Sequence, residues 1–164
     1  MKLNIVLVEP EIPQNTGNIG RTCVALGASL HLVHPLGYTI TDKQIRRAGL
    51  DYWNKLNLVH HENLESFLNS VNIQDCIFVS TKGKHCYSSI PINKECYLVF
   101  GKESAGLPED LLRSYYDYTA RIPMRDGNRS LNLSNAAAIM AYDIFRRWSF
   151  PDLQISGEIG GIHE

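Results

Sequence analysis

The chain has 164 residues, of which 44% are hydrophobic and 20% are charged. This length predicts a single domain around one core, and the ordinary composition argues against a disordered, collagen-like or coiled-coil protein. Lysine and arginine number 16 against 17 aspartate and glutamate residues, a formal net charge of −1. A polyanionic partner therefore has to be held by a local basic patch.

Short apolar runs, several of them rich in β-branched residues, predict strands buried on both faces of a parallel sheet. The predicted strands cover residues 3–8, 30–34, 56–60, 76–80, 96–100 and 118–124. Helical patterns alternate with them and cover residues 18–26, 41–49, 64–71, a segment beginning at Pro108, and a last helix from Ser134 or Asn135 to Trp148. This alternation predicts an α/β domain with a mostly parallel sheet flanked by helices.

Residues 1–150 are expected to form this one domain. Residues 151–164 carry three glycines and only acidic charges, and we expect them to be a flexible tail. No segment approaches the roughly 18 apolar residues of a membrane span. The cysteines form neither a CxxC pair nor a zinc-type set, which favours reduced thiols, no metal site and a cytoplasmic location. They are Cys23, Cys76, Cys86 and Cys96.

Segments unusually rich in turn-forming and polar residues follow three of the predicted strands. Because the carboxyl ends of parallel strands meet at one edge of the sheet, such segments are candidates for a ligand site. No GxGxxG dinucleotide motif, P-loop or nucleophile elbow occurs in them. The segments are residues 9–22, 100–108 and 122–136.

Structural explanations stay open for the first two segments. Residues 15–17 can form a turn and a helix cap, and Arg21 can be a solvated helix residue. Gly101 and Gly106 can serve a tight turn.

The third segment alternates polar side chains with Leu131 and Leu133, and carries more hydrogen-bonding groups than one helix cap requires. We therefore favour a ligand site there. Between Arg121 and Arg147 the chain has five arginines and two aspartates, a local charge of +3 that suits RNA phosphates. Arg21, Arg46 and Arg47 can extend this patch, although Arg146 and Arg147 can equally belong to a solvated helix face.

Taken together and in this order, the segments resemble the three signature motifs of the SPOUT superfamily of S-adenosylmethionine-dependent RNA methyltransferases. The resemblance is closest to the small, single-domain TrmL-like group, which methylates the ribose 2′-hydroxyl at the tRNA wobble position. It covers essentially the whole chain. The matching residues are 13–23, 100–107, 122–124 and 129–136, with further likeness at 32–37 and 47–53.

The resemblance implies an α/β fold whose C-terminal part forms a deep trefoil knot, and a homodimer. It also implies that S-adenosylmethionine binds in the knot, with Ile122 and Leu131 on either side of the adenine ring. Gly101 would let the backbone approach the cofactor closely. The implied cofactor-binding residues are Val79, Gly101, Ile122, Ser130 and Leu131.

For catalysis the resemblance implies a central role for Arg21, with Asn15 and Ser130 orienting the substrate. An arginine side chain is a poor base because it stays protonated in proteins. We therefore expect Arg21 to bind a substrate phosphate and stabilise the developing alkoxide rather than accept the proton. Tyr142 shares a helix face with Arg146 and can also be structural. The implied RNA-binding residues are Arg21, Arg129, Tyr142 and Arg146.

The resulting hypothesis is 2′-O-methylation of the wobble nucleotide, a cytidine or modified uridine, in the anticodon stem-loop of leucine tRNAs. The alternatives are a ribose methyltransferase for another tRNA or rRNA site, and a non-catalytic RNA-binding dimer of the same fold. A broken motif would favour the non-catalytic alternative, and Arg21, Gly101 and Ser130 are all present.

Overall fold

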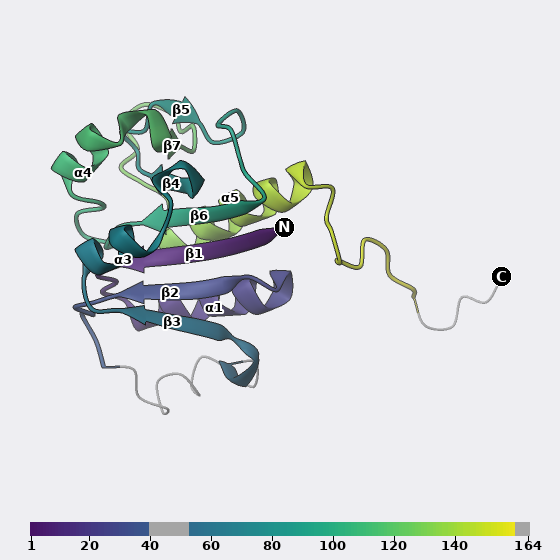
Figure 1. Cartoon of the computed structure of the whole chain (residues 1–164). Coiled ribbons are helices and arrows are strands. Elements are labelled where there is room, and N and C mark those ends of the chain that lie inside the picture. Colours follow the sequence, from purple (N-terminus) through teal and green to yellow (C-terminus); the bar gives the residue numbers. More distant parts are fainter. Residues whose placement is uncertain (40–52, 160–164) are drawn as a thin grey trace.

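The computed structural model describes residues 1–39 and 53–159, and these residues form a sheet with helices on both faces (Figure 1). The sheet has seven strands in the order β3-β2-β1-β6-β4-β7-β5, and the pairings between the described strands are all parallel. The α/β class and the parallel sheet are thus confirmed. The strands are β1 (Lys2–Val8), β2 (Ser29–Val33), β3 (Asn57–His61), β4 (Cys76–Val79), β5 (His85–Cys86), β6 (Glu95–Phe100) and β7 (Thr119–Arg121).

Two hydrophobic cores lie on opposite faces of the sheet. Along β1, Leu3, Ile5 and Leu7 point to one face, and Val6 and Val8 point to the other, as the two-residue repeat of a strand requires. The first face is covered by helices α1 (Pro13–Leu26) and α5 (Leu133–Arg147), and the second by α3 (Leu64–Ser70) and α4 (Glu109–Ser114). Single 3₁₀ turns occur at Trp53–Lys55, Ile73–Asp75 and Tyr116–Tyr118.

The strand order reverses direction between β1 and β6. From β1 the chain moves outward through α1 to β2 and β3, whereas β6, β4, β7 and β5 lie on the other side of β1. Ligands of open parallel sheets bind at the carboxyl ends of the strands at such a reversal. The loops after β1, β4 and β6 meet there, together with the chain between β7 and α5.

Helix α1 begins at Pro13, so the prediction of a helix starting near Asn18 was wrong. Proline is favoured in the first turn of a helix because its missing N–H has no intrahelical acceptor there. No side chain of α1 itself caps this end, and its first turn holds no acidic residue. The helix ends at Gly27, whose φ of 66° lets its N–H bond the Val24 carbonyl.

Helix α5 is capped by Asn132 and not by Ser134 or Asn135 as predicted. The Asn132 Oδ1 accepts hydrogen bonds from the backbone N–H groups of Ser134 at 2.9 Å and Asn135 at 3.3 Å. Strands β2 and β3 lie one residue from their predicted positions, and β7 ends three residues earlier than predicted.

Strand β5 was not predicted. It has two residues, His85 and Cys86, which pair with Ala120 and Arg121 of β7. The chain before β5 approaches β7 so closely that a Cβ at Gly83 would lie 2.4 Å from the Ala120 carbonyl carbon.

The predicted helix at residues 41–49, with Arg46 and Arg47, lies outside the described residues. The chain after α5 leaves the body of the domain (Figure 1), although Leu153 still packs against the α1/α5 core. The strand order is consistent with the knotted fold that the resemblance implies. Among the described helices, none is long and apolar enough to cross a membrane.

Candidate active site

A cavity of about 770 Å³ lies at the carboxyl edge of the sheet, between the loops after β4 and β6 and the chain leading into α5. This volume falls within the range of small-molecule sites, about 300–1,000 Å³. Seven of the predicted site residues line it, although they come from four separate parts of the chain. They are Asn15, Val79, Gly101, Ile122, Arg129, Ser130 and Leu131.

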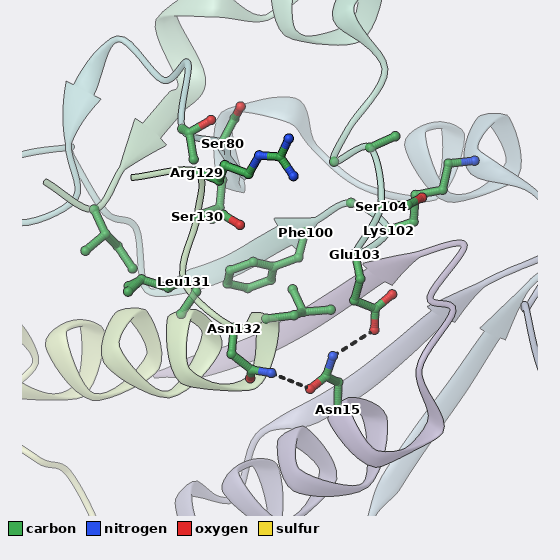
Figure 2. Close-up of a pocket in the computed structure, with 18 of the residues that line it drawn as sticks. Asn15, Ser80, Phe100, Lys102, Glu103, Ser104, Arg129, Ser130, Leu131 and Asn132 are labelled. Carbon is green, nitrogen blue, oxygen red and sulfur yellow. Dashed lines mark hydrogen bonds between the residues drawn. The ribbon is translucent and has the colours of Figure 1, made fainter. Parts of the chain in front are cut away.

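The cavity wall combines apolar surfaces with a few polar groups. Phe100 and Leu131 supply apolar surface, and Ser130 and Arg129 place a hydroxyl and a guanidinium beside it (Figure 2). Val79 adds to the apolar lining. Apolar walls with hydrogen-bonding groups beside them suit a nucleoside, whose base is apolar on its faces and whose ribose carries hydroxyls.

Asn15 is the centre of a hydrogen-bond chain of three residues that line the cavity (Figure 2). The Asn132 Nδ2 donates to the Asn15 Oδ1 at 3.0 Å, and the Asn15 Nδ2 donates to the Glu103 Oε1 at 3.0 Å. Asn15 is 4% exposed, so its amide has lost most of its contact with water. Two neighbours therefore hold the Asn15 side chain in one orientation.

Glu103 also completes the start of α1 from a distant loop. Its carboxylate accepts hydrogen bonds from the backbone N–H of Glu11 at 2.7 Å and of Ile12 at 3.2 Å. A negative charge is favourable at a helix N-terminus, and α1 has none of its own. This contact adds to the local preference of Pro13 for the first turn and stabilises the early start of α1.

Glu11 in turn binds the loop after β6, which carries Glu103. The Glu11 carboxylate accepts from the Ser104 backbone N–H and hydroxyl, both at 2.9 Å. These hydrogen bonds lower the pKa of Glu11. Next to them, Lys102 donates to Glu9 at 2.9 Å, which raises the pKa of Lys102. The loop after β6 is thus joined to the chain after β1 by reciprocal bonds.

The residues after β2 brace the same helix start. Tyr38 forms a hydroxyl–hydroxyl hydrogen bond with Thr16, and the Gly37 N–H donates to the Pro10 carbonyl at 2.9 Å. Burial raises the pKa of Tyr38 to about 12, so its hydroxyl remains protonated.

Gly101 serves a tight turn, which was the structural explanation left open for it. A Cβ at this position would lie 2.0 Å from the Gly106 carbonyl carbon and 2.1 Å from the Leu107 nitrogen. The loop turns back on itself there, with the Gly106 N–H bonding the Lys102 carbonyl at 2.8 Å. The glycine therefore permits a close approach within the chain itself.

Three predicted residues do not line the cavity: Arg21, Tyr142 and Arg146. Arg21 is exposed on α1. Tyr142 is 48% exposed on α5, and the exposed Arg146 donates to Asp143 from Nη2 at 2.8 Å. Helices α1 and α5 pack side by side on one face of the sheet, so these side chains share the side of the molecule that α1 and α5 cover.

The sequence interpretation missed Glu103 and Asn132 as site residues. Asn132 was one polar residue among several, and only the fold brings it to Asn15. For Glu103 a signal existed: the first helix lacks an acidic residue at its start, and an acidic residue occurs in a neighbouring motif. Glu103 is 92 residues from Glu11, from whose backbone N–H it accepts a hydrogen bond, and this separation hides the pairing.

Within the described residues, no cluster of three or more histidine, cysteine, aspartate or glutamate side chains could hold a metal ion. The four cysteines are free thiols. Burial raises the pKa of Cys23, Cys76 and Cys96 to about 12, so these thiols stay protonated.

Comparison with known proteins decides the family. The SpoU rRNA Methylase family model matches residues 2–142. The chain belongs to this family. A tRNA (cytidine(34)-2'-O)-methyltransferase from Saccharophagus degradans is 46% identical over 148 residues, which cover 90% of this chain and 96% of that protein. The family match confirms the resemblance to RNA methyltransferases.

Solved structures support the same assignment. One that concerns the 2-OH methylation of C/U34 on tRNA aligns with a TM-score of 0.84 and 40% identity, over 90% of this chain and 97% of that chain. An AdoMet-bound rRNA methyltransferase from Sinorhizobium meliloti aligns with a TM-score of 0.78 and 28% identity, over 89% of this chain and 56% of that chain.

Proposed function

We propose that this SpoU-family protein transfers a methyl group from S-adenosylmethionine to the ribose 2′-hydroxyl of the wobble nucleotide of leucine tRNAs, a cytidine or modified uridine. The observation that carries the proposal is the meeting of all three motif segments around one cavity. A relative that is 46% identical over most of the chain is a tRNA (cytidine(34)-2'-O)-methyltransferase, which supports the same substrate. Such a substrate is consistent with a cytoplasmic location.

The cavity fits S-adenosylmethionine. Val79, Ile122 and Leu131 offer apolar surface for the adenine, and Ser130 offers a hydroxyl beside it. When bound, the cofactor supplies a methyl group that its sulfonium has already activated. The protein then has mainly to align the attacking hydroxyl, and alignment is worth several kcal/mol in such reactions.

Asn15 and Ser130 are the proposed orienting residues. Asn15 is held by Glu103 and Asn132, so its position is set before the substrate arrives. Arg21 is proposed to bind a substrate phosphate and to stabilise the alkoxide that develops on the attacking 2′-oxygen. The hydroxyl proton passes to solvent or to a substrate phosphate, because an arginine side chain is already protonated.

Because Arg21 does not line the cavity of its own chain, we propose that it acts at the cavity of a second copy in a homodimer. Exposed apolar side chains on the same side of the molecule support an interface there, including Ile12, Leu131 and Ile139 at about 40% exposure. Arg129, Tyr142 and Arg146 would contact the RNA beside this interface.

The activity is tested by methyl transfer from labelled S-adenosylmethionine to bulk tRNA from a strain that lacks this gene, followed by nucleoside digestion. Label in 2′-O-methylcytidine or a 2′-O-methylated modified uridine, lost in Arg21→Ala, supports the proposal. Label in another nucleotide would mean that the enzyme methylates a different RNA site. If no label appears although the cofactor still binds, a non-catalytic RNA-binding dimer is the better explanation.

The dimer is tested by mixing two inactive variants. Arg21→Ala keeps an intact cavity, and Gly101→Ala keeps Arg21. If Arg21 acts on the second copy, mixed dimers regain one working site and part of the activity. If Arg21 acts within its own chain, the mixture stays inactive.

A further inference from the structure

A second cavity of about 460 Å³ adjoins the first one at the carboxyl edge of the sheet. The two cavities share Lys102, Ala105 and Gly106, so one tight turn of the loop after β6 separates them. Figure 2 shows Lys102 extending away from Phe100 and Ser130, toward the far side of this turn. A group bound in the second cavity therefore lies next to the cofactor cavity.

The second cavity has an apolar floor and two ion pairs at its wall. Val8, Leu107 and Leu112 are buried at 3%, 4% and 7% exposure and form part of the lining. Glu9 pairs with Lys102 at 2.9 Å, and Glu109 pairs with Lys82 at 2.6 Å. All four charged side chains are more than a third exposed, so a ligand can reach them.

The charges of this cavity indicate what it can bind. A phosphate would gain two ammonium groups but would meet two carboxylates, which repel it. A neutral heterocycle that has a donor next to an acceptor can use both members of one ion pair, because a carboxylate accepts from an amino group and an ammonium donates to a carbonyl. The apolar floor can then contact the face of the ring.

The backbone of Glu9 is held in an uncommon conformation. Glu9 has a φ of 49°, a left-handed conformation that is rare for residues other than glycine. Its N–H bonds the Val33 carbonyl at 2.9 Å, which holds the residue at the end of β1. Strained residues of this kind are frequent at functional sites.

We propose that the second cavity holds the base of the target nucleotide, a pyrimidine, and that Glu9 and Lys102 contact its hydrogen-bonding edge. Cytosine would donate its amino group to Glu9 and accept from Lys102 at its ring nitrogen or carbonyl. This assignment rests on the proposed function, since it places the ribose of the same nucleotide beside the cofactor cavity.

The test compares two anticodon stem-loop RNAs. One has cytidine at the target position, and the other has an abasic ribonucleotide that keeps its 2′-hydroxyl. We expect Glu9→Gln to lower kcat/KM about tenfold on the cytidine RNA and to leave the abasic RNA almost unaffected. Asp117→Asn is the matched control, because it breaks a similar Lys84–Asp117 ion pair of 2.5 Å that lies outside both cavities.

Equal losses on both RNAs, or no loss on either, would overturn the inference. Weaker S-adenosylmethionine binding by Glu9→Gln would also overturn it, because the second cavity would then belong to the cofactor site. RNA binding measured without the cofactor separates the two proposals. A wild-type protein that binds but does not methylate either RNA contradicts the proposed function, while a base-dependent effect of Glu9→Gln on binding still supports the second cavity as a base site.

Discussion

Substituting Gly101 by alanine should disable the cofactor cavity through a clash within the chain. The new Cβ would lie 2.0 Å from the Gly106 carbonyl carbon, whereas ordinary contacts begin at 3.4 Å. The backbone at residues 106 and 107 would therefore have to retreat by about 1.4 Å, a typical overpacking strain of about 1–3 kcal/mol. This movement also removes the 2.8 Å bond between the Gly106 N–H and the Lys102 carbonyl, worth about 1 kcal/mol.

The combined loss of about 2–4 kcal/mol corresponds to a fall in Tm of roughly 5–15 °C for a chain of this size. Because the same backbone forms the cavity wall, S-adenosylmethionine binding should weaken at least about tenfold. Thermal unfolding followed by circular dichroism and titration calorimetry with the cofactor measure these two effects.

Gly27→Ala is the matched control, because Gly27 lines neither cavity. Gly27 has a φ of +66°, but a Cβ there would meet nothing within 4 Å. Alanine should therefore cost only the left-handed backbone penalty, about 1–2 kcal/mol, with little change in cofactor affinity. If Gly101→Ala were no less stable than Gly27→Ala and bound the cofactor normally, the clash argument would be refuted.

Three further predictions concern the residues around the cavity. Glu103→Gln should destabilise the protein by about 1–3 kcal/mol in urea unfolding, since its oxygens face three N–H donors; a value as small as that of the exposed Asp117→Asn would contradict the capping role. Asn132→Ala should cost about 1 kcal/mol through the lost α5 cap and also slow methyl transfer through Asn15, so unchanged kcat would argue against the positioning role. Burial lowers the pKa of His31 from 6.5 to about 4, so protonation of the unfolded chain should reduce stability by up to about 3 kcal/mol as the pH falls from 6.5 to 4. In urea unfolding across this range, the free energy of unfolding should depend less steeply on pH in His31→Gln than in the wild type. An identical pH dependence would contradict the prediction.

The sheet could largely be predicted from the sequence because a strand buried on both faces is a short, continuous run of apolar residues. Residues 3–8 are almost continuously apolar, and they form β1 between two cores. Strand β5 could not be predicted in this way. Its two residues have no pattern of their own and pair with β7 only because Gly83 allows the chain to approach Ala120 closely.

Most residues that line the candidate site could be predicted from the sequence, but the physical roles of several could not. Seven of the predicted residues line one cavity. Six of them lie in the motif segments, which follow parallel strands and so reach the same edge of the sheet, and Val79 is the last residue of β4. The start of α1 depends on Pro13, which is a local signal, and on the anionic partner Glu103, which lies in another loop. Arg21 lies outside the cavity of its chain, which the position of Arg21 in the first motif segment did not indicate.

The loop after β6 links these observations, because its successive residues serve different neighbours. Gly101 allows the turn to close, Lys102 faces Glu9 in the second cavity, and Glu103 holds both α1 and Asn15. Ser104 then binds Glu11, which returns the contact to the chain after β1. A shift of this loop would therefore move the cofactor wall, the proposed base site and Asn15 together. Tight turns that carry several functional groups need such bracing, since a displacement of about 1 Å is enough to misalign a methyl donor and its acceptor.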